Sequence, residues 1–262
     1  MRKSIKLMLF FLAIPALALL ESCHVDDEMI FPPGTELDPH TYFGESVDVG
    51  DGEARAWVAV DKDGNPKAVG INFSEEALEN LPHELMQFVL PLPADKGKGF
   101  YTHALVDWNP EGHEPPGTYD KPHFDFHFYI ISNEDRMAIG PNDTVQFANA
   151  PDSIYAPPAY LHTPGGVPQM GAHWVDLMAP EFTGGTFSKT FVWGSYDGKF
   201  IFWEPMITLD YLKTHPDDII PLRQPQAYQQ DGWYPTKWKV SHSSVNDEYT
   251  VAIINLKYHK GE

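Results

Sequence analysis

One short stretch, residues 123–129, constrains the fold of this chain more than any other. It reads His-Phe-Asp-Phe-His-Phe-Tyr, and residues two apart lie on the same face of a β-strand. The three phenylalanines therefore share one face, which we expect to point into a hydrophobic core. The opposite face carries two imidazoles and a carboxylate, from His123, Asp125 and His127.

Imidazole and carboxylate groups in this arrangement suit zinc, iron or copper. Metal ligands are usually gathered from several strands and loops, and three other positions could complete a site. The alternative is that these histidines are hydrogen-bonded to acidic neighbours, in a chain with 12 histidines and 37 acidic residues. We predict a site for a divalent transition metal, zinc or iron. Its candidate ligands are His113, His123, Asp125, His127, His173 and Glu204.

Two other patterns are weaker. His123 and Asp125 followed by His173 match the ligand spacing of iron- and 2-oxoglutarate-dependent oxygenases, but residues 174–188 lack the basic residue that holds their cosubstrate. His103 and Asp107 share a face of an earlier expected strand, and we interpret them as structural.

The first 22 residues resemble a bacterial lipoprotein signal peptide. A basic start precedes an apolar run over residues 7–20, which is too short for a comfortable membrane span. The run ends at Leu20-Glu-Ser-Cys23, and Cys23 is the only cysteine. We predict lipidation of Cys23, and hence a membrane anchor in the cell envelope, on the outer membrane. An acidic run at 26–28 resembles a surface-export signal, or it is a solvated part of a tether over residues 23–40.

Charge limits the partners of the mature chain. The full chain has a formal net charge of −19, and removal of the leader leaves 15 basic and 36 acidic residues, or −21. Such a chain repels the phosphates of nucleic acids, so we expect no nucleic-acid partner. The same negative field favours a divalent cation.

Short strands separated by turns dominate the remaining chain. We expect strands near residues 54–60, 67–73, 86–90, 100–108, 123–131, 186–193, 199–204, 233–240 and 248–258. Short helices are expected at 74–80, 132–137 and 208–213, where capping residues precede apolar ones. The pattern predicts a mainly β fold, an antiparallel sandwich or barrel-like single domain over residues 41–262.

Residues 141–171 are rich in proline and glycine, and we expect this segment to form an ordered lid or wall over the face that carries His123 and His127.

Three segments resemble the shared core of an exported bacterial family catalogued as a domain of unknown function. They are PHFDFHFY at 122–129, GAHWVD at 171–176 and GSYDGKFIFWEPMIT at 194–208. The resemblance extends from about Arg55 to the C-terminus. It implies a secreted or envelope location and a β-rich fold, and it is compatible with a homo-oligomer. It implies no activity and no catalytic residues.

Three functions follow from these patterns. The first is a binding or assembly protein with a metal site. The second is a metal-dependent hydrolase or oxygenase-like enzyme, in which Asp125 or Glu204 acts as general base beside a metal-bound water. The third is a metal-free small-molecule or glycan binding module, with a groove lined by Tyr155 and Tyr160.

Overall fold

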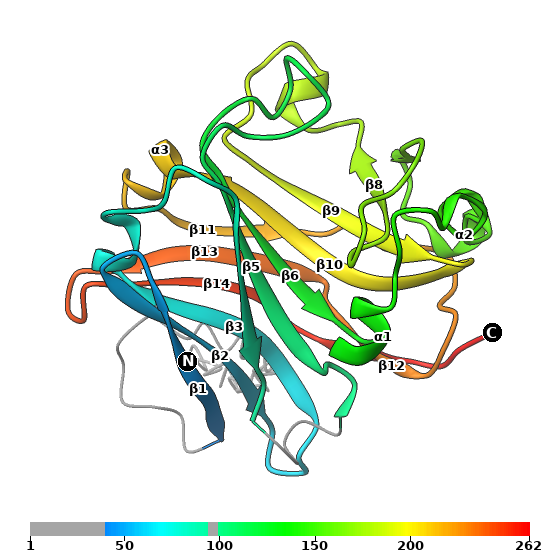
Figure 1. The fold of residues 1–262 in the computed structure, drawn as a ribbon. Helices are drawn as coiled ribbons and strands as arrows, with labels where there is room; N and C mark the ends of the chain where they lie inside the picture. Colours follow the sequence, from blue (N-terminus) through cyan, green and yellow to red (C-terminus); the bar gives the residue numbers. More distant parts are fainter. Residues whose placement is uncertain (1–39, 94–98) are drawn as a thin grey trace, which may run out of the picture.

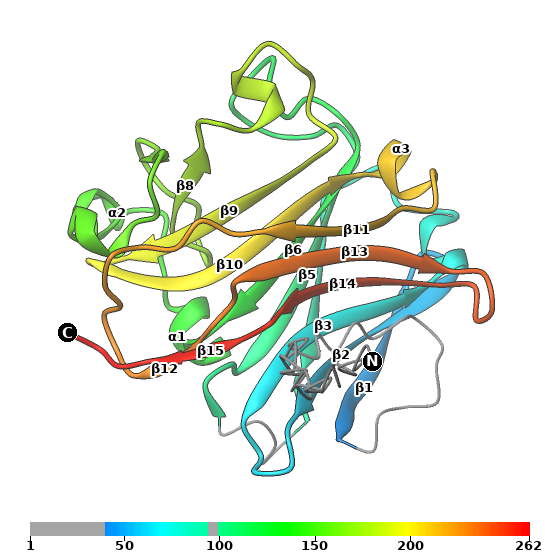
Figure 2. The ribbon, with the colours of Figure 1, turned by 180° about the vertical axis from the view of Figure 1, so that it is seen from behind.

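The structure, a computed structural model, describes residues 40–93 and 99–262. The predicted signal peptide, Cys23 and nearly all of the predicted tether lie outside the described residues. The described chain forms two antiparallel sheets that pack as a sandwich (Figures 1 and 2). The predicted mainly β class is thereby confirmed.

The six-stranded sheet has the order β1-β2-β3-β14-β13-β11. Its strands are β1 (Thr41–Val49), β2 (Gly52–Val60), β3 (Pro66–Ser74), β14 (Glu248–Ile254), β13 (Lys237–Ser243) and β11 (Asp217–Pro221). A small two-stranded sheet pairs β12 (Gly232–Tyr234) with β15 (Lys257–His259).

The seven-stranded sheet has the order β4-β5-β6-β10-β9-β8-β7. Its strands are β4 (Met86–Pro91), β5 (His103–Asn109), β6 (His123–Tyr129), β10 (Lys199–Thr208), β9 (Lys189–Tyr196), β8 (Ala172–Asp176) and β7 (Tyr160–His162). The short helices are α1 (Asn133–Met137), α2 (Thr144–Ala148) and α3 (Leu209–Leu212), together with 3-10 turns η1 (Glu75–Leu78), η3 (Ser153–Tyr155) and η4 (Pro180–Phe182).

Several predicted boundaries need correction. The strand expected from residue 100 begins at His103, and each of the two expected C-terminal strands is split, into β12 with β13 and into β14 with β15. Pro235 lies at the first break, and proline has no backbone N–H to donate to a ladder. The proline-rich segment contains α2, η3 and β7.

The main core lies between the sheets. Phe124, Phe126 and Phe128 of β6 are all buried in it, as the alternation predicted. Phe124 and Phe126 meet Phe73 of the facing sheet, whose ring centroid lies 6.3 and 5.6 Å from theirs. Burying one such side chain contributes roughly 1.5–3 kcal/mol, so this face of β6 fixes how the strand lies.

The other face of β6 is covered by loops instead of by a sheet. The loop after β5 and the loop between β8 and β9 rise side by side at the top of Figure 1. Tyr119 of the first packs edge-on against Phe187 of the second, with ring centroids 4.9 Å apart. Lys121 also donates to the backbone carbonyl of Phe187. These two loops therefore enclose the polar face of the sheet near His123.

Within the described part of the chain, no helix is long and apolar enough to cross a membrane.

Candidate metal centre

Strand register brings the predicted ligands to one face of the seven-stranded sheet. On β6, His123, Asp125 and His127 are all buried. Asp125 and His127 lie opposite Asp107 and Leu105 of β5. Glu204 comes from β10, the neighbour of β6 on the other side. Trp203, the residue before it, is in the core, so the alternation of β10 turns Glu204 toward the outer face.

The six residues separate into two groups of three. The first triad is His113, His123 and Asp125, and the second triad is His127, His173 and Glu204. In each triad the candidate ligand atoms lie within 4.8 Å of one another. We expected one surface on which His123, His127 and His173 act together, whereas the structure places His123 in one triad and the other two histidines in the second.

In the first triad, two imidazoles face one carboxylate. Nε2 of His123 lies 3.1 Å from Oδ1 of Asp125, and Nε2 of His113 lies 3.4 Å from Oδ2. Nδ1 of each ring is 2.6–2.7 Å from a backbone carbonyl, that of Lys121 for His123 and of Glu114 for His113. A carbonyl can only accept, so Nδ1 carries the proton and a neutral ring has its lone pair on Nε2. This is the tautomer of a metal ligand with an outer backbone partner.

The second triad repeats the arrangement. Nε2 of His127 and Nε2 of His173 each lie 3.5 Å from a different carboxylate oxygen of Glu204. His127 and Glu204 are almost fully enclosed, and His173 is about one-fifth exposed. Phe202 packs against both imidazoles, with centroids 5.0 and 5.6 Å away.

Gly194 of β9 makes that packing possible. It lies between Phe202 and His173 in the sheet register. A methyl group at Gly194 would come within 1.9 Å of the Phe202 ring. The position therefore accepts only a residue without a side chain, and this allows Phe202 to lie beside His127 and His173.

Three of the four N–O contacts in the two triads have the spacing expected for two ligands of one ion. Charge-assisted N–H···O bonds are about 2.7–2.9 Å long, shorter than all four contacts. Two ligands bound at about 2.0–2.2 Å to one tetrahedral zinc ion lie roughly 3.3–3.5 Å apart. Nε2 of His123 and both ring nitrogens of His127 make no hydrogen bond of good geometry with the described residues. Buried polar atoms are otherwise nearly always satisfied, so a cation between them would account for the spacing.

The two triads differ in how burial and neighbouring charges shift the pKa values of their side chains. Burial raises the pKa of Asp125, but the charge of His123 and the contact with His113 outweigh it and hold that pKa below its usual range. Burial lowers the pKa of His127 to about 3 and that of His173 to about 4. Burial, with the charges of Asp125 and Asp107, raises the pKa of Glu204 well above its usual range. All three shifts in the second triad favour the uncharged forms of these side chains, and an ion bound here would replace the proton of a protonated Glu204.

Asp107, which we interpreted as structural, lies beside the first triad. It lies directly opposite Asp125 in the β5–β6 ladder, where like charges repel. Burial and the charge of Asp125 raise its pKa to about 8. Asn109, two residues along β5, donates to Asp125 at 2.8 Å and orients that carboxylate. His103 stacks on Tyr129 and belongs to none of the described ligand groups.

The proline-rich segment covers the neighbouring part of the same face. Phe147 of α2 and Met170 pack in a cluster with Leu105, Tyr129 and Phe202. The segment therefore forms a wall next to the second triad, while the two loops described above cover the first. This agrees with the expected wall at the His127 end of the site.

Comparison with known proteins gives one match. Residues 61–108 match the model of a family described as "TTHB210-like: Hypothetical protein TTHB210". This local match is consistent with an uncharacterised family. It includes Asp107 but none of the six predicted ligands, and it lies outside the three segments that carry the resemblance to an exported family. No curated protein matches the chain. No solved structure matches it.

Proposed function

We propose that this chain binds zinc-class divalent ions at the first and second triads and uses them for hydrolytic chemistry. The observation that carries the proposal is the spacing of the six ligands, whose N–O contacts of 3.1–3.5 Å suit an ion better than a hydrogen bond. Each triad has two nitrogens and one carboxylate, a composition typical of catalytic zinc sites.

An open coordination position favours catalysis over a purely structural role. Structural zinc sites are closed by four protein ligands, whereas catalytic sites keep a position for water. Each triad supplies three ligand residues within the described chain. The partly exposed imidazoles of His113 and His173 mark the side from which water and substrate reach the site. A bound ion supplies Lewis acidity and lowers the pKa of a bound water.

Asp107 is the residue best placed to move a proton. A general base works best when its pKa lies near the working pH, and burial beside Asp125 raises the pKa of Asp107 to about 8. Gln87 donates to its Oδ2 at 3.4 Å. Asp107 thus takes the role of general base that we first considered for Asp125 and Glu204, because those two are ligands.

Metal analysis and a hydrolysis assay test this proposal together. The purified protein should contain up to two ions at these triads, and it should hydrolyse activated esters such as p-nitrophenyl acetate or bis(p-nitrophenyl) phosphate. Asp107→Asn should keep the metal and lose most of the rate, about 10²–10⁴-fold for loss of a general base. A protein that retains no ions after chelator-free purification would refute the metal site. A metal-loaded protein without hydrolysis would leave the binding or assembly role.

A separate cavity supports a second candidate function, small-molecule or glycan binding. A cavity of about 420 Å³ is lined by aromatic rings and by polar groups. Trp203 lines it from the face of β10 opposite to Glu204. The indole N–H groups of Trp193 and Trp203 find no acceptor among the described residues. The principal residues that line this cavity are Tyr155, Trp193, Trp203, Tyr228, Gln229 and Tyr234.

This arrangement would suit a neutral ligand with both an apolar face and hydroxyl acceptors. Tyr155 lines the cavity as we expected for the groove, but Tyr160 instead donates to the backbone of Phe191. Trp193 fluorescence during titration with neutral oligosaccharides tests the candidate, with a Tyr155→Ala variant as comparison. Identical flat titrations of both proteins would remove it.

We also propose that the mature chain is anchored to the envelope through a lipid on Cys23, on the evidence of the leader and its lone cysteine. Cys23→Ser should move the protein from the membrane fraction to the soluble fraction. Unchanged partitioning would show that the anchor is assigned wrongly.

A further inference from the structure

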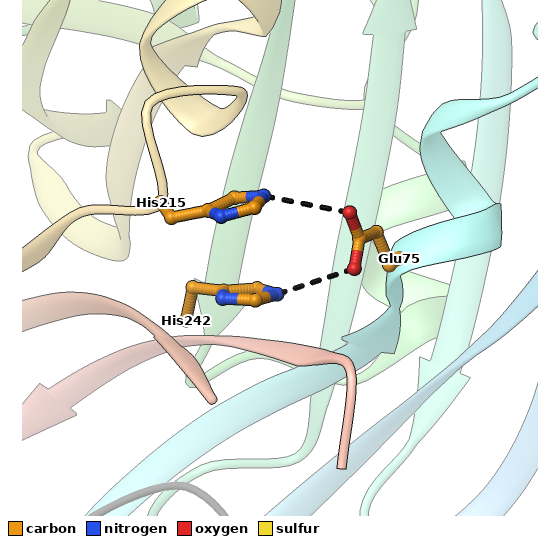
Figure 3. A group of neighbouring side chains, drawn as sticks. All are labelled: Glu75, His215 and His242. Carbon is orange, nitrogen blue, oxygen red and sulfur yellow. Dashed lines mark ion pairs between the residues drawn. The ribbon is translucent and has the colours of Figure 1, made fainter. Parts of the chain in front are cut away.

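A third group of metal-ligand side chains lies far from the triads described above, and we call it the clasp triad. It consists of Glu75, His215 and His242. Glu75 opens η1, His215 follows α3, and His242 belongs to β13. Figure 3 shows the two imidazole rings stacked, each turned toward a different oxygen of the same carboxylate. The rings are 3.9 Å apart and 14° from parallel.

The distances in the clasp triad repeat those of the first and second triads. Nε2 of His215 is 3.4 Å from one carboxylate oxygen of Glu75, and Nε2 of His242 is 3.5 Å from the other. Both are longer than charge-assisted hydrogen bonds, and both suit two ligands of one tetrahedral ion.

One observation besides the distances points to a ligand between these side chains. The side chain of His242 is only 4% exposed, and its Nε2 makes no hydrogen bond of good geometry with a described residue. Buried polar atoms are nearly always satisfied, so this nitrogen is available to a ligand. The backbone of His215, which carries the second imidazole, has a φ of +53°.

We propose that the clasp triad binds one zinc-class divalent ion, with solvent in the remaining coordination position. Imidazole nitrogens and a carboxylate are ligands for zinc. An ion between the three side chains accounts for their chemistry and their spacing without moving any of them.

Such an ion would tie together three segments that are distant in sequence. The ladder of the six-stranded sheet joins β3 to β14 and β14 to β13, but η1 and the turn at His215 lie outside it. A shared ion therefore holds the α3–β11 turn against η1 at one end of the sandwich. Half of the Glu75 and His215 side chains is exposed, so this ion exchanges readily with solvent.

Zinc titration of the metal-free, purified full chain tests the proposal. His242→Phe removes the ligand but keeps a ring beside His215 and Tyr249, and Glu75→Gln removes the carboxylate charge at a partly exposed position. Each variant should bind one equivalent of zinc fewer than the wild type. His259→Phe is the matched control, because His259 stacks on Tyr228 at 4.0 Å and is in none of the described ligand groups. It should bind as many equivalents as the wild type.

Hydrogen exchange supplies a second measurement. Zinc should slow exchange at η1 and at residues 213–216 in the wild type but not in Glu75→Gln. Equal zinc stoichiometry in the wild type, His242→Phe and Glu75→Gln would overturn the proposal. The outcome is independent of the first and second triads, because variants of His127 should remove a zinc ion bound at the second triad and leave the clasp triad intact.

Discussion

Histidine and carboxylate side chains meet in two very different settings in this protein. The first and second triads lie on a sheet face enclosed by loops, and His123, His127 and Glu204 are at most 2% exposed. In the clasp triad, Glu75 is 43% exposed and His215 50%. The same residue types are therefore mostly enclosed in one place, whereas in the other two of the three side chains are about half exposed and His242 alone, at 4%, is buried. A buried polar group without a partner costs more free energy than an exposed one. Removal of a ligand or an ion should therefore change the free energy of unfolding more at the enclosed triads than at the clasp triad.

Removal of a buried ligand should have the largest effect. His127→Ala should abolish binding at the second triad and reduce the free energy of unfolding by about 3–5 kcal/mol, because it removes one of the two imidazoles beside Glu204 and opens a cavity. Thermal unfolding and elemental analysis measure the two effects. His103→Ala is the matched control: it removes a buried, stacked imidazole, so it should lower the melting temperature but leave the metal content unchanged. Full metal occupancy in His127→Ala would contradict the site.

Asp107→Asn should change how the stability of the metal-free protein depends on pH. The pKa of Asp107 is raised from 3.8 to about 8 by burial and by Asp125. The folded state therefore binds the proton more tightly than the unfolded chain, so stability is highest below pH 4 for this group and is lost as the pH rises toward 8. Denaturant unfolding at pH 5 and pH 9 should show a loss of roughly 2–4 kcal/mol from this group, absent in Asp107→Asn.

A substitution that touches no ligand should still disturb the second triad. Gly194→Ala would force Phe202 away from its position between His127 and His173. Overpacking of this kind costs about 1–3 kcal/mol, and we expect zinc affinity at the second triad to fall about tenfold. Isothermal titration with zinc measures it. Gly64→Ala, where nothing lies within 4 Å of the added methyl group but φ is +76°, should lower stability without a change in zinc affinity.

The clasp triad should show the smallest effect on stability. In metal-free protein, Glu75→Gln should change the free energy of unfolding by no more than about 1 kcal/mol, since exposed ion pairs contribute little. The corresponding variant Glu204→Gln should change it by more, because Glu204 is 2% exposed and interacts with Asp125 and Asp107. Chemical denaturation of both variants tests the contrast, and equal effects would show that burial does not separate the two settings.

Features that depend on a single strand could be predicted from the sequence, whereas features that depend on how the strands pair could not. The alternation in β6 placed its phenylalanines in the core and its histidines on the other face, because side-chain direction follows directly from strand periodicity. The division into two triads depends on the sheet order β6-β10-β9-β8, which no single strand specifies.

The position of Asp107 opposite Asp125 could not be predicted for a related reason. This position depends on how the loop between β5 and β6 sets the register, and that loop is too long for turn rules to fix it. The clasp triad had no sequence signal at all, since its members are 27 to 167 positions apart in the chain. The positive φ of His215 is likewise visible only in the folded backbone.

The alternation of β6 also disfavours pairing of this strand in the wrong register. A slip of one residue against β5 or β10 would turn three phenylalanines toward the loops and put two imidazoles and a carboxylate into the apolar core. Neither face tolerates the exchange, since one loses its apolar contacts and the other gains unsatisfied polar groups. If the proposed ions bind at both triads, a metal-loaded chain has also paired β5, β6 and β10 in the correct register, and metal content would then serve as a measure of correctly folded protein.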